Sequence, residues 1–252
     1  MAGLVEGKSG LVTGSAGGIG RATAIALARE GANVVVTDLP ARAQDGEETV
    51  RLITAAGGTA RFVPGDVTVD ADAKAVVDAT VEAYGRLDFA HNNAGIELQA
   101  SVTGTTEPEW DAIMNVNVKG VWLGLRHQIV RMVAQGGHGA IVNTASLAGL
   151  MAVPSLAAYI ASKHAVVGLT KAAAIECAEH EIRVNCVCPA AIGTAMITSL
   201  PPERQLELMA PQAIKRIGQP EEVGEAVTWL ISDRASFVTG VAMPVDAGAM
   251  AQ

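Results

Sequence analysis

The sequence of 252 residues lacks the marks of membrane, secreted and nucleic-acid-binding proteins. No apolar run approaches the about 18 residues that a membrane-spanning helix needs. Residues Met1–Lys8 have neither the charged region nor the long apolar region of a signal peptide. No run of Lys or Arg is present and the formal net charge is −8, which argues against nucleic acid or an anionic membrane as a partner. We therefore expect a cytoplasmic protein whose partners are small molecules.

Cysteine is scarce, and neither cysteine nor histidine shows the spacing of metal ligands. Cys177, Cys186 and Cys188 form an odd set, and the last two lie in an apolar run where small hydrophobic residues would serve equally well. We expect buried, inert thiols. The histidines are His91, His127, His138, His164 and His180, which we interpret as structural or solvent-facing. The sequence therefore predicts no metal site.

Short apolar runs alternate with longer stretches rich in Ala and Leu, and this alternation predicts the fold. Half of the residues are hydrophobic, and a chain of this size can bury roughly three quarters of its unfolded surface. Continuous apolarity is typical of strands covered on both faces, whereas the stretches between them are long enough to be crossover helices. The expected strands are 10–13, 33–37, 60–63, 87–91, 140–144, 182–187 and 241–245, and the clearest helices are 19–29, 71–84 and 157–178. We predict an α/β protein: a single domain over 1–252, built on a Rossmann-type doubly wound parallel sheet with helices on both faces.

One segment, 194–219, does not fit this alternation. It carries Pro201, Pro202 and Pro211 among apolar residues such as Met196. Such a composition fits a mobile loop better than a central strand or helix. We predict that this segment forms a cap over the substrate site.

A glycine-rich turn follows the first expected strand and leads directly into the first expected helix. Glycine permits a tight turn and a close approach of the backbone to phosphates, and the free N–H groups at a helix start favour negative charge. The spacing Gly-x-x-x-Gly-x-Gly departs from the more familiar Gly-x-Gly-x-x-Gly, and such turns also occur for purely structural reasons. We predict a pyrophosphate site made by Gly14, Ser15, Gly17, Gly18, Ile19 and Gly20.

An acidic residue, Asp38, ends the second expected strand, eighteen residues beyond Gly20. This is close to the spacing of about 20 residues expected for a carboxylate that accepts hydrogen bonds from the adenosine ribose. A carboxylate there repels a 2′-phosphate, although an Asp after a strand can also be a turn or helix-cap residue. Arg42 is the only nearby cation that could favour NADP. We therefore predict NAD(H) as the cofactor.

Further motifs follow in a fixed order along nearly the whole chain. They are Thr13-Gly14-x-x-x-Gly18-x-Gly20, Asp66-Val67, Asn92-Asn93-Ala94-Gly95, Asn117, Ser146, Tyr159-x-x-x-Lys163 and the stretch Pro189–Thr194. From about Lys8 to Gly248 the chain thereby resembles the short-chain dehydrogenase/reductase family. The resemblance implies that Leu39, Asp66, Val67, Asn92, Asn93, Ala94, Gly95, Pro189, Ile192 and Thr194 contact the cofactor. Ala190 and Ala247 depart from the family pattern, which commonly has glycine after the proline.

The spacing of Tyr159 and Lys163 places a phenol and an ammonium on one face of a helix. A phenol that works near pH 7–8 needs its pKa lowered by about 2–3 units, and a nearby ammonium can supply much of this. Ser146 follows a central strand, where open α/β sheets place their sites. A surface Tyr/Lys pair and a turn serine are the structural alternatives. The resemblance implies that Ser146 orients the substrate, Tyr159 exchanges its proton, and Lys163 binds the nicotinamide ribose and lowers the pKa of Tyr159.

Asn117 is the fourth candidate catalytic residue. It matches a family position that holds a water joining Lys163 to solvent, and Asn115 is the competing candidate. An asparagine inside a helix has poor propensity, which points to a special role or to a local helix bend or core hydrogen bond.

Together these features predict an NAD(H)-dependent oxidoreductase that interconverts a secondary alcohol and a ketone. Five apolar residues between Ser146 and Tyr159 favour a hydrophobic substrate: Leu147, Leu150, Met151, Val153 and Leu156. Two long apolar-rich helical stretches, Glu109–Val133 and Ala157–Ala178, together with the family resemblance, predict a homotetramer. The alternatives are a non-catalytic NAD(H)-responsive binding protein and a nucleotide-sugar epimerase, whose relatives usually need an added substrate domain.

Overall fold

The computed structural model describes residues 3–251 and contains a parallel sheet of seven strands in the order β3-β2-β1-β4-β5-β6-β7. Every neighbouring pair in this order is parallel. The strands are β1 (Ser9–Thr13), β2 (Asn33–Asp38), β3 (Thr59–Pro64), β4 (Phe89–Asn92), β5 (Gly139–Thr144), β6 (Ile182–Pro189) and β7 (Ala242–Val245). The predicted Rossmann-type doubly wound sheet is confirmed.

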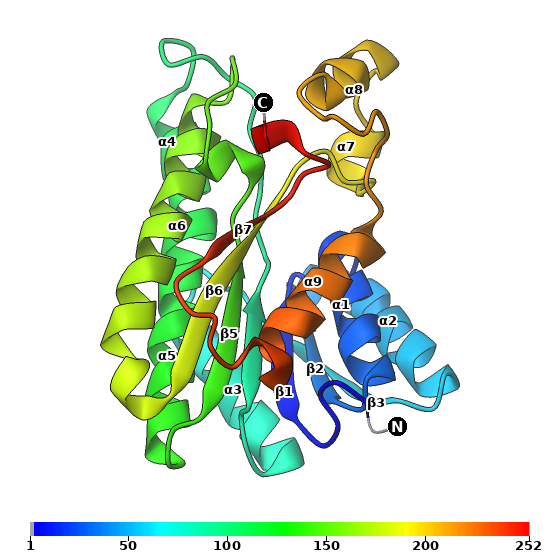
Figure 1. Cartoon of the computed structure of the whole chain (residues 1–252), viewed down its shortest axis with the longest axis vertical. Helices are drawn as coiled ribbons and strands as arrows, with labels where there is room; N and C mark the ends of the chain where they lie inside the picture. Colours follow the sequence, from blue (N-terminus) through cyan, green and yellow to red (C-terminus); the bar gives the residue numbers. More distant parts are fainter. Residues whose placement is uncertain (1–2, 252) are drawn as a thin grey trace.

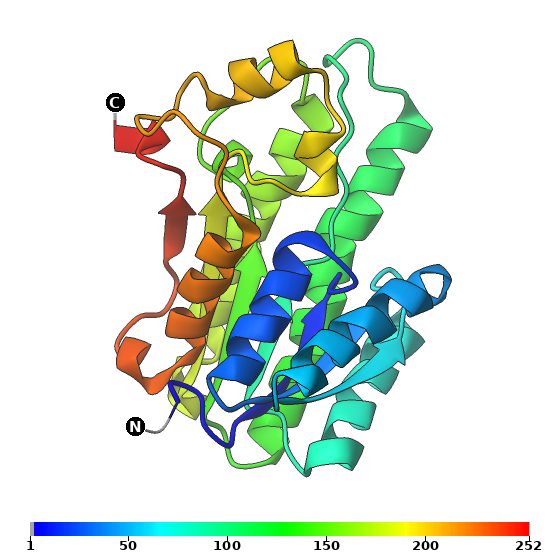
Figure 2. The same cartoon turned by 90° about the vertical axis from the view of Figure 1, so that its right-hand side faces the viewer.

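Helices cover both faces of this sheet (Figures 1 and 2). One layer contains α1 (Gly18–Arg29), α2 (Ala43–Ala55) and α9 (Pro220–Ile231), and the other contains α3 (Asp70–Tyr84), α5 (Gly120–Ala134) and α6 (Ala157–Glu176). Neighbouring strand residues serve opposite layers: Leu11 belongs to one apolar cluster and Val12 to the other. This double burial explains why the central strands read as continuous apolar runs.

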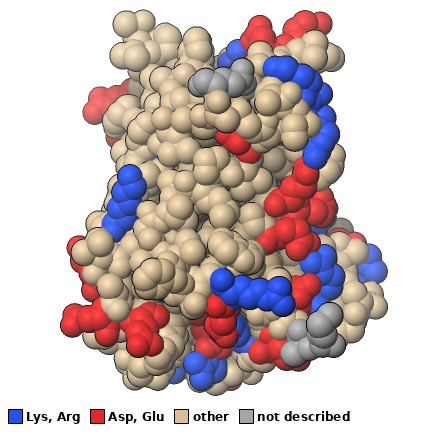
Figure 3. Space-filling model, in the orientation of Figure 1, with Lys and Arg blue, Asp and Glu red and all other residues tan. Residues whose placement is uncertain are grey.

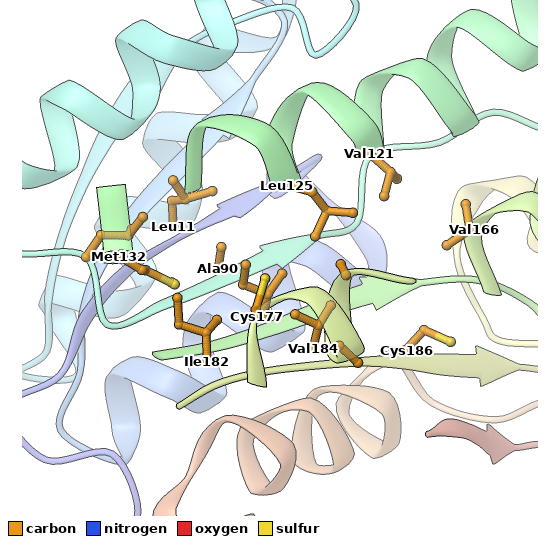
Figure 4. Packing of buried hydrophobic residues seen from close by; sticks show 14 of the residues in the cluster. Leu11, Ala90, Val121, Leu125, Met132, Val166, Cys177, Ile182, Val184 and Cys186 are labelled. Carbon is orange, nitrogen blue, oxygen red and sulfur yellow. The ribbon is translucent and has the colours of Figure 1, made fainter. Parts of the chain in front are cut away.

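The three cysteines lie in the apolar layer beneath α5 and α6, with Leu125, Val166 and other aliphatic side chains (Figure 4). All three are buried free thiols, as the sequence predicts. Their surroundings are those of small apolar side chains.

The carboxyl ends of all strands lie at one edge of the sheet, which is the upper edge in Figure 1. The chain runs outward from β1 through β2 to β3 and then returns to place β4 on the other side of β1. Such a reversal of strand order opens a crevice between the loops that follow the two central strands. None of the helices in residues 3–251 is long and apolar enough to cross a membrane.

The segment 194–219 arches over this edge (Figure 2) and differs from the irregular loop expected from its prolines. It contains two short helices, α7 (Ala195–Thr198) and α8 (Pro202–Met209). Pro202 occupies the first turn of α8, where a missing N–H removes no helical hydrogen bond. The prolines therefore begin a helix here.

The chain between 107 and 134 is one helical rod with an interruption. α4 (Glu107–Met114) and α5 are joined by a π-helical turn over Asn115–Lys119. Single π-turns inside helices occur frequently at functional sites. Asn117 lies in the middle of this turn, so the helix irregularity foreseen as an alternative for this residue is present.

Ala247, one of the two departures from the family pattern, has a φ of 53°. This left-handed conformation favours glycine, because the Cβ atom crowds the backbone. The carbonyl oxygen of Ala247 accepts hydrogen bonds from the N–H groups of Ala213 and Ile214, at 2.9 and 3.1 Å. These bonds tie the end of the cap to the chain after β7.

Candidate active site

A cavity of about 1040 Å³ lies at the carboxyl edge of the sheet, beneath the cap. It is continuous from the glycine turn to the helices of the cap. Most of the predicted site residues line it: Gly14, Gly17, Gly18, Ile19, Asp38, Leu39, Asp66, Val67, Asn93, Ala94, Gly95, Ser146, Tyr159, Lys163, Pro189, Ile192 and Thr194. The fold thus brings together residues that are up to 180 positions apart in the chain.

The glycine turn forms a cradle that side chains would fill. Gly14 and Gly18 have φ values of 63° and 52°, and a Cβ atom on Gly14 would lie 2.8 Å from the Cα of Ala94. Gly17 is the N-cap of α1 and has no side chain to cap the first N–H groups of the helix. Free N–H groups at a helix start bind phosphate oxygens well. The cradle therefore fits the pyrophosphate of a dinucleotide.

Two residues assigned to the cofactor in the sequence lie behind this cradle. The Ser15 hydroxyl donates to the carbonyl oxygen of Val12 at 2.7 Å, and the Ser15 N–H donates to that of Thr37 at 3.2 Å. A Cβ atom on Gly20 would clash with the carbonyl oxygen of Gly14, so this glycine allows α1 to pack against the turn. Ser15 and Gly20 support the turn, and neither lines the cavity.

Asp38 lies at the end of β2 on the cavity wall. Its carboxylate accepts hydrogen bonds from the N–H groups of Ala16 and Leu39, at 3.0 and 2.9 Å. Each oxygen keeps a lone pair, so the group can also accept from ribose hydroxyls. Arg42 is close to Gly17, but its Nε donates to Asp45 Oδ2 at 2.8 Å. The charges in this part of the cavity therefore fit NAD(H), since Arg42, the one cation among residues 3–251 that lines it, has an acidic partner.

The chain after β4 forms the floor between the two ends of the cavity. The N–H groups of Asn93 and Ala94 donate to the Thr13 hydroxyl at 2.9 and 3.0 Å. The Asn93 side chain donates to the carbonyl oxygens of Thr13 and Gly14, at 3.1 and 3.2 Å. Thr13 is thus a positioning residue, whereas from the sequence it was named only as the first residue of the glycine motif.

Asn92, which we expected to form part of the floor under the ribose, does not line the cavity. Its side chain is buried beneath the cavity, where it exchanges hydrogen bonds with Gln128 at 2.7 and 3.0 Å and donates to Asn143 at 2.9 Å. Successive residues of a strand point to opposite faces of the sheet. Asn92 therefore faces the core while Asn93 reaches the cavity.

Ser146, Tyr159 and Lys163 lie together at the other end of the cavity. Ser146 follows β5 and caps a short 3₁₀ turn, where its hydroxyl accepts from the N–H of Ala148 at 3.1 Å. Tyr159 and Lys163 are one turn apart on α6, and both are buried. The Lys163 ammonium donates to the carbonyl oxygen of Thr144 at 2.9 Å and lies 5.6 Å from the centre of the Tyr159 ring.

Burial has the largest effect on the pKa values of Tyr159 and Lys163. It raises the pKa of Tyr159 above its usual value, the negative charge of Glu97 raises it further, and the hydrogen bond with Ser146 lowers it. Burial also lowers the pKa of Lys163 to about 8. The lowered pKa that we expected for Tyr159 is therefore absent from the chain by itself, because burial disfavours both charged forms.

Asn117 lies behind the cavity wall and connects its parts. Its side-chain oxygen accepts from the N–H of Ile96 at 2.8 Å, and its amide donates to the carbonyl oxygen of Ile96 at 2.9 Å and to the Ser162 hydroxyl at 3.0 Å. Asn115, the competing candidate, lines the cavity. A Cβ atom on Gly95 would lie 3.2 Å from Asn117 Oδ1 and 3.3 Å from Lys163 Nζ, so all three residues meet at one point.

The substrate end of the cavity is mainly apolar. Leu147, Val153 and Leu156 line it, as expected from their position between Ser146 and Tyr159, and the cap adds Met196, Ile197 and Leu208. Leu150 and Met151 do not line it, and Leu150 instead packs against the core. Among residues 3–251, no group of three or more His, Cys, Asp or Glu side chains is placed to hold a metal ion.

Three charged residues that line this end of the cavity were not singled out from the sequence: Glu97, Arg204 and Glu207. Glu97 comes two residues after the Asn92–Gly95 motif. Arg204 belongs to the cap helix α8. The position of Glu97 beside the motif could have indicated that it lines the cavity. The sequence could not place Arg204 at the cavity, because its position depends on how the cap folds.

A phenol, an ammonium and a hydroxyl beside a dinucleotide cradle can hold a carbinol or carbonyl oxygen and exchange a proton with it. Comparisons with known proteins agree with this chemistry. A family model described as Enoyl-(Acyl carrier protein) reductase matches residues 14–250. The chain is 40% identical to the cyclohexanol dehydrogenase of Acinetobacter sp. (strain SE19) over 247 residues, which cover 98% of this chain and 96% of the relative.

Two solved structures share the fold over nearly the whole chain. The crystal structure of levodione reductase superposes with a TM-score of 0.92 at 35% identity, covering 98% of this chain and 99% of the other. That of carveol dehydrogenase from Mycobacterium avium, in complex with NAD, superposes with a TM-score of 0.93 at 30% identity, covering 99% and 100%. These matches confirm the resemblance seen in the sequence, and the chain belongs to the short-chain dehydrogenase/reductase family.

Proposed function

We propose that this protein is an NAD(H)-dependent oxidoreductase that interconverts a hydrophobic, cyclic secondary alcohol and its ketone. The observation that carries this proposal is the shared cavity. It joins the glycine cradle and Asp38 at one end to Ser146, Tyr159 and Lys163 at the other. A dinucleotide bound in the cradle would therefore direct its nicotinamide toward the buried phenol.

Each residue of the reactive end has a defined task in this proposal. NAD⁺, when bound, supplies the hydride acceptor for the carbinol carbon. The Ser146 hydroxyl orients the substrate oxygen, and Tyr159 as phenolate takes the hydroxyl proton from it. Lys163, held by the carbonyl oxygen of Thr144, favours the phenolate and binds the nicotinamide ribose. In ketone reduction Tyr159 donates the proton instead.

Asn117 holds the proton path open in this proposal. Its hydrogen bonds fix the backbone of Ile96 and the Ser162 hydroxyl on either side of the point where it meets Lys163. A water beside Lys163 can then pass the proton to solvent. The π-helical turn that contains Asn117 supports this role, because such turns occur frequently at functional sites.

The substrate class follows from the apolar lining of the cavity. Aliphatic side chains from the loop before α6 and from the cap surround the reactive end, and such pockets gain affinity mainly from apolar area. The relatives named for cyclohexanol, levodione and carveol support cyclic substrates. The complete set of Ser146, Tyr159, Lys163 and Asn117 favours an enzyme over a non-catalytic NAD(H)-binding protein.

The test is the appearance of NADH at 340 nm with a panel of secondary alcohols. The panel contains cyclohexanol, aryl alcohols and linear sugar alcohols, each with NAD⁺ and with NADP⁺. We expect the highest kcat/KM for a cyclic or aryl alcohol with NAD⁺. A polar sugar alcohol that exceeds every hydrophobic alcohol would overturn the substrate class, and no turnover of any alcohol or ketone would favour the binding-protein alternative.

A further inference from the structure

Glu97 is a carboxylate in an apolar cavity with nothing of the protein bound to it. It is half-buried in the loop after β4 and lines the substrate end of the cavity. None of the residues in 3–251 donates a hydrogen bond to its carboxylate or forms an ion pair with it. A buried carboxylate is stabilised only when its oxygens accept hydrogen bonds. Water, or a polar group of a ligand, must therefore fill its acceptor positions.

The nearby cation on the cap does not satisfy this need. The guanidinium of Arg204 pairs with Glu207 through Nη1 at 2.5 Å. Its Nε and Nη2 also donate to the side-chain oxygen of Gln99, at 3.2 and 2.9 Å, when the Gln99 amide is oriented to accept them. Arg204 is thereby held at the mouth of the cavity by two other partners.

Glu97 also opposes the proposed chemistry. Its negative charge acts on both Tyr159 and Lys163 and disfavours the phenolate on which alcohol oxidation depends. An aliphatic or amide side chain would avoid this penalty at the same position. A carboxylate at this position is therefore explained if it binds a polar group of the substrate.

Resting on the proposed function, we propose that Glu97 accepts a hydrogen bond from a second hydroxyl of the substrate, so that the preferred substrates are cyclic diols or hydroxyketones. A neutral hydroxyl fits because the positive charges of Lys163 and Arg204 already act on this carboxylate at longer range, and a third cation would be repelled by them. A carboxylic acid would meet the like charge of Glu97. An apolar group placed there would displace water and leave the carboxylate unsatisfied.

The magnitude follows from the general behaviour of buried polar pockets. A site built to hydrogen-bond a hydroxyl rejects the analogue that lacks it, by factors of up to about 10⁴–10⁵ when the site is fully closed. The half-buried position of Glu97 gives a smaller effect. We expect the best diol to exceed cyclohexanol by at least about tenfold in kcat/KM, well above the factor of two due to having two equivalent hydroxyls.

The test compares cyclohexanol with the cis and trans isomers of cyclohexane-1,2-diol, 1,3-diol and 1,4-diol. Turnover with NAD⁺ is measured for wild type, Glu97→Leu, Glu97→Gln and the control Glu203→Gln, which changes an exposed carboxylate of α8 outside the cavity. The ratio of the best diol to cyclohexanol falls to about two in Glu97→Leu, takes an intermediate value in Glu97→Gln, and is unchanged in Glu203→Gln. Turnover without a diol preference in wild type, or a preference that survives Glu97→Leu, overturns the inference.

A binding measurement separates this inference from the proposed function. Calorimetry with NADH present gives the affinity of each diol and of cyclohexanol without any reaction. Tighter binding of a diol that is lost in Glu97→Leu supports the role of Glu97 even where no alcohol is turned over, in which case only the proposed function fails. Equal binding of diols and cyclohexanol by wild type and Glu97→Leu contradicts the inference.

Discussion

The phenol of Tyr159 is buried in a place where burial by itself opposes ionisation. Desolvation and Glu97 raise its pKa, whereas the hydrogen bond with Ser146 lowers it. The positive charge of a bound NAD⁺ would favour the phenolate, and the chain by itself lacks this influence. In the proposed reaction we therefore expect Tyr159 to ionise more readily in the complex with NAD⁺ than in the chain alone.

The charge of Glu97 gives a test of this balance through the pH dependence of alcohol oxidation. The Glu97→Gln change removes a negative charge that raises the pKa of Tyr159. Oxidation needs the phenolate, so the rate rises with pH, and the midpoint of this rise shifts to lower pH in the variant. Profiles of kcat/KM for cyclohexanol measure the shift, with Glu203→Gln as control. A midpoint that stays in place or moves upward speaks against an interaction between Glu97 and the titrating base.

Asp38 holds the backbone of the glycine turn and lines the part of the cavity where we propose that the adenosine ribose binds. A 2′-phosphate near its carboxylate costs about 2–4 kcal/mol through repulsion and lost hydrogen bonds. NAD⁺ is therefore preferred over NADP⁺ by roughly 30- to 700-fold. Asp38→Asn removes the charge and keeps an acceptor oxygen for only one of the two backbone N–H groups of Ala16 and Leu39. We expect the preference to fall below about tenfold.

The ratio of kcat/KM for the two cofactors, measured in wild type and Asp38→Asn, checks this expectation. Equal use of both cofactors by wild type would defeat the argument. An unchanged preference in the variant would assign the discrimination to another residue, with Arg42 the first to examine.

At this scale, residue type and spacing predicted which side chains reach the cavity but not every direction in which they point. Asp38, Ser146, Tyr159 and Lys163 lie where the motifs place them. Ser15 and Asn92 turned away from the cavity because adjacent residues of turns and strands face opposite sides. Glu97 was missed since its importance comes from the surrounding apolar wall, which forms only on folding.

At the scale of elements, the glycine turn and the start of α1 form one device. Gly14 and Gly18 need their left-handed conformations for the chain to turn, but Gly17 is extended, with φ near −174°. A Cβ atom on Gly17 would have only Arg42 Nη2 within 4 Å, at 3.6 Å. The backbone at Gly17 does not require glycine. We infer that glycine at this position keeps the cavity free of a side chain.

This difference predicts separate effects on stability and binding. Gly17→Ala leaves the free energy of unfolding within about 0.5 kcal/mol of wild type, because the backbone is relaxed and the methyl meets open space. NADH binding weakens by at least about tenfold, since the methyl stands where the phosphates approach. Denaturant unfolding and fluorescence titration with NADH measure the two effects.

Gly14→Ala is the matched comparison, because its methyl would press on the backbone of Ala94 in a left-handed conformation. We expect this variant to lose stability as well as binding. Undiminished NADH affinity in Gly17→Ala would show that the dinucleotide does not lie in this cradle.

The strands were predictable to within about two residues, whereas the cap was not. Apolar runs such as 33–37 are buried on both faces, so their composition alone identifies them. The cap helices α7 and α8 are short. The prolines of this segment indicated a loop, because a proline inside a helix disrupts it, although a proline in the first turn can begin one. The π-turn at Asn117 depends on bonds to Ile96 and Ser162, which are distant in sequence.

At the scale of the whole molecule, two surfaces of the single chain are apolar. Trp122 and Val130 on α5 and Ile175 on α6 are exposed, on the layer opposite α1. The strand β7 is an open edge of the sheet, and the middle of this face is mostly uncharged in Figure 3 apart from an acidic patch, while charged side chains gather toward its upper and lower ends. Open edges and apolar helix faces are commonly covered by partner subunits.

Two such surfaces predict a homotetramer with two kinds of two-fold interface. Light scattering at micromolar concentration should give about four times the chain mass of 25.8 kDa. Trp122→Glu would place a charge in one apolar face and reduce the assembly to dimers, whereas Glu203→Gln would leave it intact. A wild-type monomer at this concentration would contradict the prediction.

The central claim is that the buried phenol of Tyr159 exchanges the substrate proton beside a bound NAD(H). Tyr159→Phe removes only the hydroxyl, so the ring still fills its place on α6 and the cradle is unaltered. A positioned acid or base contributes about 10²–10⁴-fold. The decisive measurement is kcat for cyclohexanol oxidation together with the Kd of NADH in this variant. We predict a loss of at least about 100-fold in kcat with NADH affinity retained, and turnover within about threefold of wild type would contradict the account.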